Sequence, residues 1–241
     1  MTAINQNTLS KEQLDLIERF IASYNTIDRH LRDTLKAEQN VPFSQLVREY
    51  AARNPRWHDQ EPLRMAGDLR NVVVHQRQNS YEYLSVPIPS VVENLERIKD
   101  FFKSPERVYP KFRRDVIIFQ ANDVLSDVLK CINETSFSQF PIYDQKRYLG
   151  LLTENGITRW LARHSTTVMT LIELNEILVK EVFNQEEERQ NCQFISRNAT
   201  LLEAENQFVR HPMLEALLIT EKGKPEETLT GIMTRWDVLN L

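Results

Sequence analysis

The chain contains few cysteines, little net charge and no long apolar run. Its two cysteines, Cys131 and Cys192, belong to no Cys-x-x-Cys pair and to no histidine cluster. Reduced, structural thiols are therefore expected rather than a disulfide or a zinc site. The formal net charge of −4 gives no general attraction to nucleic acid or to membranes, so an RNA contact would need a local patch. Because there is no apolar signal region and no apolar run long enough to span a bilayer, we expect a cytoplasmic protein.

The bulk composition is that of an ordinary soluble protein. Hydrophobic residues make up 41% of the chain and charged residues 27%, so a buried core is available. A length of 241 residues suits one large or two modest domains.

The first hundred residues carry the helical pattern. Apolar residues recur at helical spacing over residues 9–37, where Ser10 is placed as N-cap and Gln13 as its capping-box partner. Three more helices are expected, over residues 42–54, over residues 60–78 and from Ser90 to about residue 102. Residues 1–103 are therefore predicted to form an all-α domain in up-down order.

After residue 103 the pattern changes to short strands and helices. Residues 104–114 carry prolines and basic side chains, and we expect them to be a linker. Two β-α-β-β-α units follow, over about residues 115–164 and 192–241, and together they form an internal repeat over residues 115–241. The predicted fold class is α+β, an all-α domain followed by this pair.

The second unit ends in a strand that runs directly into a helix, through residues 231–237 (Gly-Ile-Met-Thr-Arg-Trp-Asp). Residues 150–160 nearly repeat this pattern. Thr234 is placed as the helix N-cap, and the free N–H groups of a helix start attract anions. Asp237, one turn later, has a carboxylate able to hold two vicinal hydroxyls. A phosphate-binding helix start and a diol-binding carboxylate at one strand end together indicate a nucleotide site.

This repeat resembles a pair of CBS domains, the Bateman module that binds adenine nucleotides between its two units. The resemblance rests on Gly231-Ile232-Met233-Thr234 with Asp237, on Ala199-Thr200-Leu201, on Phe140-Pro141-Ile142-Tyr143 and on Gly150-Leu151-Leu152-Thr153. It implies an adenine nucleotide (AMP, ADP or ATP) with Thr234 on the phosphate and Asp237 on the ribose. It also implies base or phosphate contacts from Ile195, Ser196, Arg197 and Thr200, with Thr153 as a phosphate contact in the first unit. In that unit Gly156 stands where the pattern has an Asp.

Each of these residues also has a plain structural interpretation. Thr234 and Asp237 can be an N-cap and an N3 acid that only stabilise a helix start. Arg235 is either a phosphate partner or a solvated surface cation. Trp160 and Trp236, which we place at equivalent positions of the two units, are expected in an interface or a core rather than against a base.

The third predicted helix holds a second group of polar residues. At helical spacing its buried face comprises Met65, Leu69, Val72 and Val73. A polar stripe beside it comprises Arg64, Asp68, Asn71 and His75. Arg70 lies at the opposite edge. A histidine near neutral pKa could act as base toward a ribose 2′-hydroxyl, while an arginine stabilises phosphorane charge.

This Arg70-Asn71-x-x-x-His75 spacing within four helices resembles the HEPN family. Its ribonuclease members place an Arg, often followed by a polar residue, four to six residues before a His, whereas other members serve in dimerisation or RNA binding. The resemblance implies Arg70, Asn71 and His75 as catalytic residues without a metal, and a homodimer that assembles the cleft. Buried hydrogen bonds between helices are the structural alternative for the same residues.

Three functions follow from these patterns. The first is nucleotide sensing, in which a ligand of the C-terminal pair controls an HEPN-like helical domain. The second is a metal-independent ribonuclease regulated by nucleotide, which acts on RNA. The third is a structural dimer scaffold. None requires a membrane.

Overall fold

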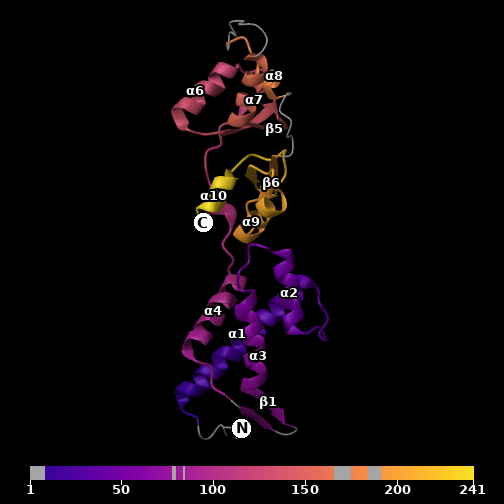
Figure 1. The fold of residues 1–241 in the computed structure, drawn as a ribbon, viewed down its shortest axis with the longest axis vertical. Helices are drawn as coiled ribbons and strands as arrows, with labels where there is room; N and C mark the ends of the chain where they lie inside the picture. Colours follow the sequence, from indigo (N-terminus) through magenta and orange to yellow (C-terminus); the bar gives the residue numbers. More distant parts are fainter. Residues whose placement is uncertain (1–8, 78–79, 84, 166–174, 184–190) are drawn as a thin grey trace. The chain divides into compact units, whose positions relative to one another are not determined.

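The computed structural model describes residues 9–77, 80–83, 85–165, 175–183 and 191–241. Contacts divide the chain into two compact units, Met1–Glu106 and Arg107–Leu241, which we call the helical unit and the C-terminal unit (Figure 1). Among the described residues no helix has both the length and the apolar character needed to cross a membrane.

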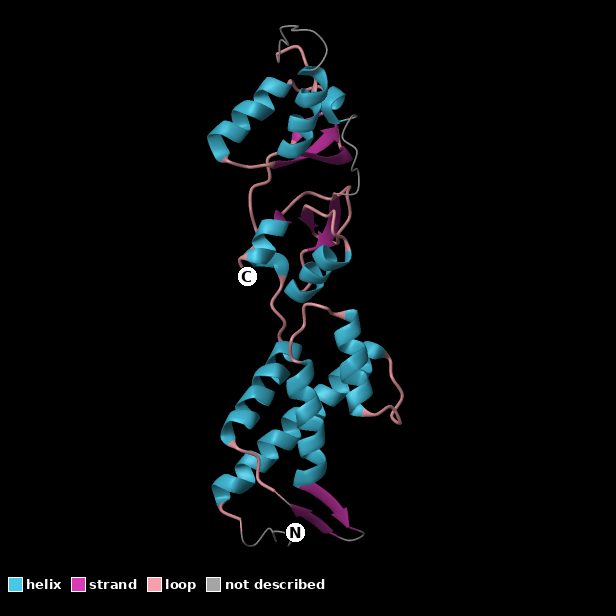
Figure 2. Ribbon diagram, viewed as in Figure 1, coloured by secondary structure: helices cyan, strands magenta, loops and turns pink. Residues whose placement is uncertain are grey.

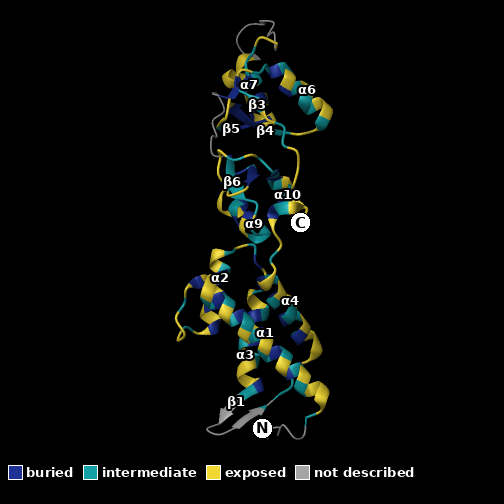
Figure 3. Cartoon of the chain, turned by 180° about the vertical axis from the view of Figure 1, so that it is seen from behind, coloured by how far each residue is buried: buried dark blue, intermediate teal, exposed yellow. Residues whose placement is uncertain are grey.

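The helical unit is built around its first helix. Ser10 caps this helix as expected, because its hydroxyl accepts from the Gln13 N–H at 3.2 Å while the Gln13 side chain accepts from the Ser10 N–H at 2.9 Å. Arg19 joins this helix to the fourth helix through two bonds to Glu96, at 3.0 and 2.7 Å. Buried residues line the sides of the helices that face one another (Figure 3). The helices are α1 (Lys11–Leu35), α2 (Phe43–Arg53), α3 (Gln60–Val73) and α4 (Pro89–Lys103).

The predicted third helix is too long at its C-terminal end. Helix α3 stops at Val73, and a hairpin of β1 (Val74–Arg77) and β2 (Ser80–Tyr83) follows it (Figure 2). A run of three β-branched valines precedes this point, and such residues favour strands over helices. The prediction of an all-α domain is therefore wrong over this segment.

The predicted buried face of α3 is also partly wrong. Leu63, Ala66 and Val73 are buried, whereas Met65 is 61% exposed and Val72 is 46% exposed. The residues that face the core are spaced three or seven apart, so the buried stripe is turned away from Met65. Helix α3 thus leaves apolar side chains at the surface.

The C-terminal unit contains two copies of one small sheet, each with a parallel pair followed by an antiparallel pair. The predicted β-α-β-β-α order is confirmed in both copies. The first repeat has β3 (Phe119–Gln120), α6 (Leu125–Thr135), β4 (Gln139–Asp144), β5 (Arg147–Thr153) and α7 (Glu154–Ser165). The second repeat has β6 (Cys192–Ser196), α9 (Leu201–Arg210), β7 (Ala216–Thr220), β8 (Gly231–Thr234) and α10 (Arg235–Leu239).

The two sheets meet through aromatic and amide contacts. The rings of Tyr148 and Phe194 touch edge-on, with centroids 4.8 Å apart. The side chain of Asn191, itself buried, donates to the Leu151 carbonyl at 3.3 Å. These contacts join β5 of one repeat to the start of β6 in the other.

Residues 107–114, expected to be a linker, belong to the core of the second repeat. This segment, the first strap, contains α5 (Val108–Lys111), and its Val108 and Phe112 pack with the core of that repeat. The Val108 N–H donates to the Ala199 carbonyl at 3.0 Å. A Cβ on Gly231 would lie 2.1 Å from the Phe112 carbonyl oxygen, so the close approach of the strap explains this glycine.

A second strap, residues 177–183, packs on the first repeat in the same way. It contains α8 (Val179–Phe183), whose Val179 N–H donates to the Asp123 carbonyl at 2.8 Å. Val179 and Phe183 are buried in the core of the first repeat. Each repeat is thus completed by the segment that precedes the other repeat in the chain.

Candidate functional site

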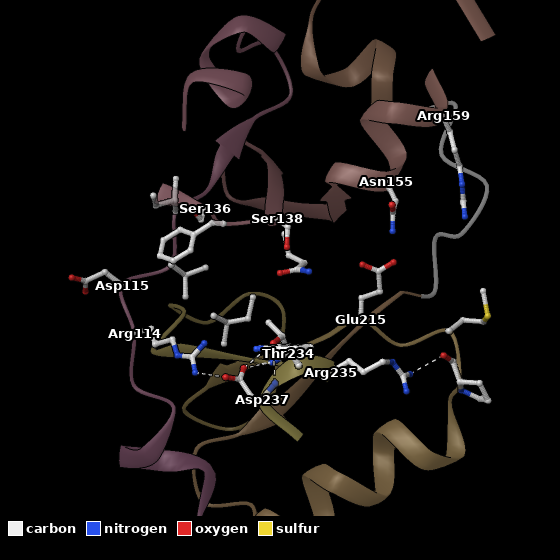
Figure 4. Close-up of a pocket in the computed structure, with 18 residues that line it drawn as sticks. Arg114, Asp115, Ser136, Ser138, Asn155, Arg159, Glu215, Thr234, Arg235 and Asp237 are labelled. Atoms are coloured by element: carbon white, nitrogen blue, oxygen red, sulfur yellow. Dashed lines mark hydrogen bonds and ion pairs between the residues drawn. The ribbon is translucent and has the colours of Figure 1, made fainter. Parts of the chain in front are cut away.

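A cavity of about 580 Å³ lies within the C-terminal unit and is lined by both repeats (Figure 4). Its volume falls in the range of about 300–1,000 Å³ that is typical of small-molecule sites. The lining residues are 114–117 and 136–139, Asn155, Arg159, Pro212, Met213, Glu215, Ile232 and 234–237.

Thr234 and Asp237 lie on the cavity wall, where they form a capping box. The Asp237 carboxylate accepts from the Thr234 N–H at 2.7 Å and from its hydroxyl at 2.8 Å. The predicted N-cap and N3 acid are therefore confirmed. The same carboxylate forms an ion pair with Arg114 at 2.5 Å, which the dashed line in Figure 4 marks.

Arg235 has a structural role that neither sequence interpretation describes. Its guanidinium donates to the backbone carbonyls of His211, Pro212 and Leu214, at 2.7 to 3.1 Å. Arg235 thereby holds the loop between α9 and β7. These bonds engage Nε and Nη2, and Arg235 also lines the cavity, so its contact with a phosphate stays a prediction.

Polar groups from both repeats meet across another part of the cavity. In Figure 4, Asn155 of α7 and Glu215 of the second repeat point toward each other, with Arg159 beside them. Asn155 and Arg159 lie one turn apart on α7, so one face of that helix supplies both. Amide, carboxylate and guanidinium groups together offer donors and acceptors to a ligand.

Apolar side chains make up much of the remaining wall, including Ile117, Phe137, Met213, Ile232 and Trp236. Of the two tryptophans, Trp160 is 4% exposed and belongs to a core, whereas Trp236 is 72% exposed, so a core position is wrong for Trp236 and a place in an interface stays a prediction. Trp236 is the second residue of its helix and Trp160 the seventh of its own, so the two positions are not equivalent.

Five other predicted site residues lie outside the described lining of this cavity. Thr153 is buried, and its hydroxyl accepts from the Gly156 N–H at 3.0 Å. Thr200 caps α9 in a capping box with Glu203, the counterpart of the Thr234 box. Of the other three, Ile195 and Ser196 end β6 and Arg197 follows it.

Arg197 and Ser196 have partners at that strand end. The Arg197 guanidinium pairs with Glu221 at 3.0 Å and lies 3.9 Å from the Tyr109 ring centroid, and the Ser196 hydroxyl donates to the Glu221 carbonyl at 3.0 Å. These contacts tie β6 to the end of β7 and to the first strap. Arg197 and Ser196 thus have structural roles at this strand end.

The polar stripe predicted on the third helix is not formed as one helical face. Arg70 and Asn71 lie in the last turn of α3, whereas His75 belongs to β1, where its backbone pairs opposite Glu82. Arg70 lies near Tyr24 of α1: burial raises the pKa of Tyr24 to about 12, and the nearby Arg70 charge opposes that rise. The side chain of His75 lies outside the described residues.

Sequence reasoning missed the cavity residues that come from the first strap and from the first repeat. Arg114 was assigned to the linker, although the spacing of Val108 and Phe112 matches that of Val179 and Phe183 in the second strap. This repeated pair of apolar residues was the available signal. The described residues contain no cluster of three or more His, Cys, Asp or Glu side chains that could hold a metal ion.

Comparison with protein families gives one match, in which residues 109–163 fit the model of the CBS domain. The matched range begins in the first strap and ends in α7. The C-terminal unit thus contains a CBS domain, as the resemblance implied for this part of the chain. No match was found among curated proteins.

Several solved structures are similar to this chain at low identity. The CBS domain of a CBS-domain-containing membrane protein from Sphaerobacter thermophilus has a TM-score of 0.46 and 18% identity, over 62% of this chain and 97% of that one. A putative archaeal homologue of γ-AMPK from Methanocaldococcus jannaschii has a TM-score of 0.43 and 20% identity, over 60% of this chain and 51% of that one.

A third similar structure is a CBS domain pair in complex with 5′-methylthioadenosine and S-adenosyl-L-methionine, with a TM-score of 0.42 and 14% identity, over 56% of this chain and 94% of that one. At such TM-scores and identities, the ligand of the present chain has to be inferred from its own cavity.

Proposed function

We propose that the C-terminal unit binds an adenine nucleotide (AMP, ADP or ATP) in the cavity, and that the nucleotide regulates the helical unit. One observation carries this proposal: a cavity of about 580 Å³ combines an apolar wall with a carboxylate and guanidinium groups. The apolar wall suits a purine ring, the carboxylate suits ribose hydroxyls and a guanidinium suits a phosphate.

The apolar part of the wall supports a planar aromatic ligand. Ile117 and Phe137 come from the first repeat, and Ile232 and Trp236 from the second. Because the two repeats supply opposite sides, a ring between them would be enclosed by apolar atoms on both faces. Asn155 supplies an amide donor and acceptor of the kind that pairs with the edge of a purine.

Binding is tested by a thermal-shift panel on the full chain. A ligand that binds only the folded state stabilises it by mass action and so raises the melting temperature. At a ligand concentration of a hundred times Kd, the free energy of unfolding rises by about 2.7 kcal/mol. AMP, ADP or ATP should shift the transition of the C-terminal unit, and the corresponding guanine nucleotides should shift it less. The proposal is contradicted if none of the three adenine nucleotides and three guanine nucleotides shifts the melting temperature.

Regulation of the helical unit is supported by the shortness of the connection. Helix α4 ends at Lys103, and the first strap begins at Arg107, so residues 104–106 make the covalent connection between them. The first strap then continues to the cavity residue Arg114. A change at the cavity can therefore reach the start of the connection within one short segment.

Hydrogen exchange tests this regulatory step separately. With AMP bound, we expect altered exchange at the amides of α4 as well as at those of β8. Altered exchange confined to the C-terminal unit would refute regulation of the helical unit while leaving nucleotide binding intact.

We also propose a homodimer, because α3 leaves Met65 and Val72 exposed beside an apolar groove of about 350 Å³. Met65 itself lines this groove, and an apolar surface of this kind can pack against the same surface of a second copy about a two-fold axis. Light scattering should give twice the chain mass of 28.4 kDa. Met65→Glu should shift the protein toward monomer, whereas Glu49→Lys on the exposed side of α2 should not; a monomeric wild type contradicts the proposal.

A further inference from the structure

Arg114 occupies a particular position in the cavity. It ends the first strap, lines the cavity and pairs with Asp237, and its side chain is 42% exposed while that of Asp237 is 14% exposed. Its guanidinium carbon lies 5.6 Å from the centroid of the buried Phe112 ring. The charged end of the side chain therefore lies over the Phe112 ring of the strap and on the cavity wall.

The Asp237 carboxylate cannot hold both a ribose diol and Arg114 in the present arrangement. One oxygen, Oδ2, already accepts from the N–H and the hydroxyl of Thr234, at 2.7 and 2.8 Å. The other oxygen, Oδ1, accepts from Arg114. A carboxylate has about four lone-pair sites in total. Two ribose hydroxyls need two of them, so one bond to Arg114 or to the cap must be released.

The bond to Arg114 is the one that can be released at low cost. Releasing Thr234 would open the first turn of α10, whereas Arg114 is partly solvated and reaches other positions without moving the backbone. The Arg235 guanidinium is held by backbone carbonyls, so it does not compete for this role.

We propose that Arg114 selects ligands with a 5′-phosphate by exchanging partners. On binding, the guanidinium leaves Oδ1 of Asp237 and donates to the phosphate oxygens, while Oδ1 becomes available to both ribose hydroxyls. The exchange replaces one ion pair by another and allows both hydroxyl bonds, so the charge on Arg114 stays compensated throughout. A ligand without the phosphate has to break the Arg114–Asp237 pair and offers the guanidinium no anion in return.

This inference rests on the proposed function, and calorimetry with AMP and adenosine tests it on the full chain. The wild type should bind AMP roughly ten- to a hundredfold more tightly than adenosine, the size expected for hydrogen bonds to a charged group. In Arg114→Gln the ratio should fall to about one, because AMP binding weakens while adenosine binding is unchanged or tighter. Arg114→Lys, which keeps the charge without the two-pronged geometry, should give an intermediate ratio.

Arg113→Gln is the matched control, since Arg113 is exposed, adjacent in the strap and outside the cavity lining. It should keep the wild-type ratio. The inference is overturned if Arg114→Gln and Arg114→Lys both keep the wild-type ratio of AMP to adenosine affinity. It is also overturned if both variants lose affinity for AMP and for adenosine by the same factor. A wild type that binds neither ligand instead overturns the proposed function.

Discussion

Replacing Phe112 by Ala tests whether the first strap is a structural part of the second repeat. The side chain is 4% exposed and packs with the core of that repeat, next to the fully buried Val108. Truncating a buried phenylalanine removes its transfer free energy and leaves a cavity, which together cost about 3–5 kcal/mol. Truncating a phenylalanine in a solvated linker would instead change the free energy of unfolding by no more than about 0.5 kcal/mol.

Hydrogen exchange at β7 measures this cost without interference from the helical unit. The free energy of opening should fall by the same amount, which accelerates exchange roughly a hundred- to several-thousandfold. Phe183→Ala is the matched comparison, because Phe183 has the same place in the second strap at 7% exposure, and it should accelerate exchange in β5 instead. Unchanged exchange in β7 of Phe112→Ala would refute the placement of the strap.

The remaining predictions concern titration and thiol reactivity. Burial against Phe102 lowers the pKa of His30 below its usual 6.5, so the folded state binds this proton less readily than the unfolded state does. The helical unit should therefore lose stability as the pH falls below about 6.5, and His30→Gln should reduce that loss in denaturant titrations at pH 7 and pH 5; an identical loss in the variant would contradict it. Cys192 is partly exposed, and desolvation of its thiol raises its pKa to about 12. Iodoacetamide should therefore label this thiol more slowly in the native state than after unfolding, and equal rates would refute the raised pKa.

Local signals in the sequence predicted most helix starts and both small sheets. The capping boxes at Ser10 and Thr234 need only residues three positions apart, so the sequence alone identifies them. The end of α3 was missed because a valine run is compatible with either a buried helix or a strand. The partner strand β2 decides between them, and that pairing is tertiary information.

The strap and much of the cavity were missed for a related reason. Val108 and Phe112 have no periodic neighbours, and their burial depends on a repeat about ninety residues away in sequence, which no local pattern encodes. Likewise, Arg114 and Glu215 became cavity residues only through the packing of the two repeats. The Thr234 motif, by contrast, was found because its strand end, N-cap and N3 acid all lie within residues 231–237.

The central claim, nucleotide binding at the Asp237 wall, is tested most directly by calorimetry on two matched variants. Asp237→Ala and Glu203→Ala each remove the N3 acid of a capping box in the second repeat, so each should cost about 1 kcal/mol of stability. Of the two acids, only Asp237 lines the cavity. The account predicts that Asp237→Ala weakens AMP binding roughly ten- to a hundredfold while Glu203→Ala leaves it unchanged. An AMP dissociation constant that is the same in the two variants would contradict it.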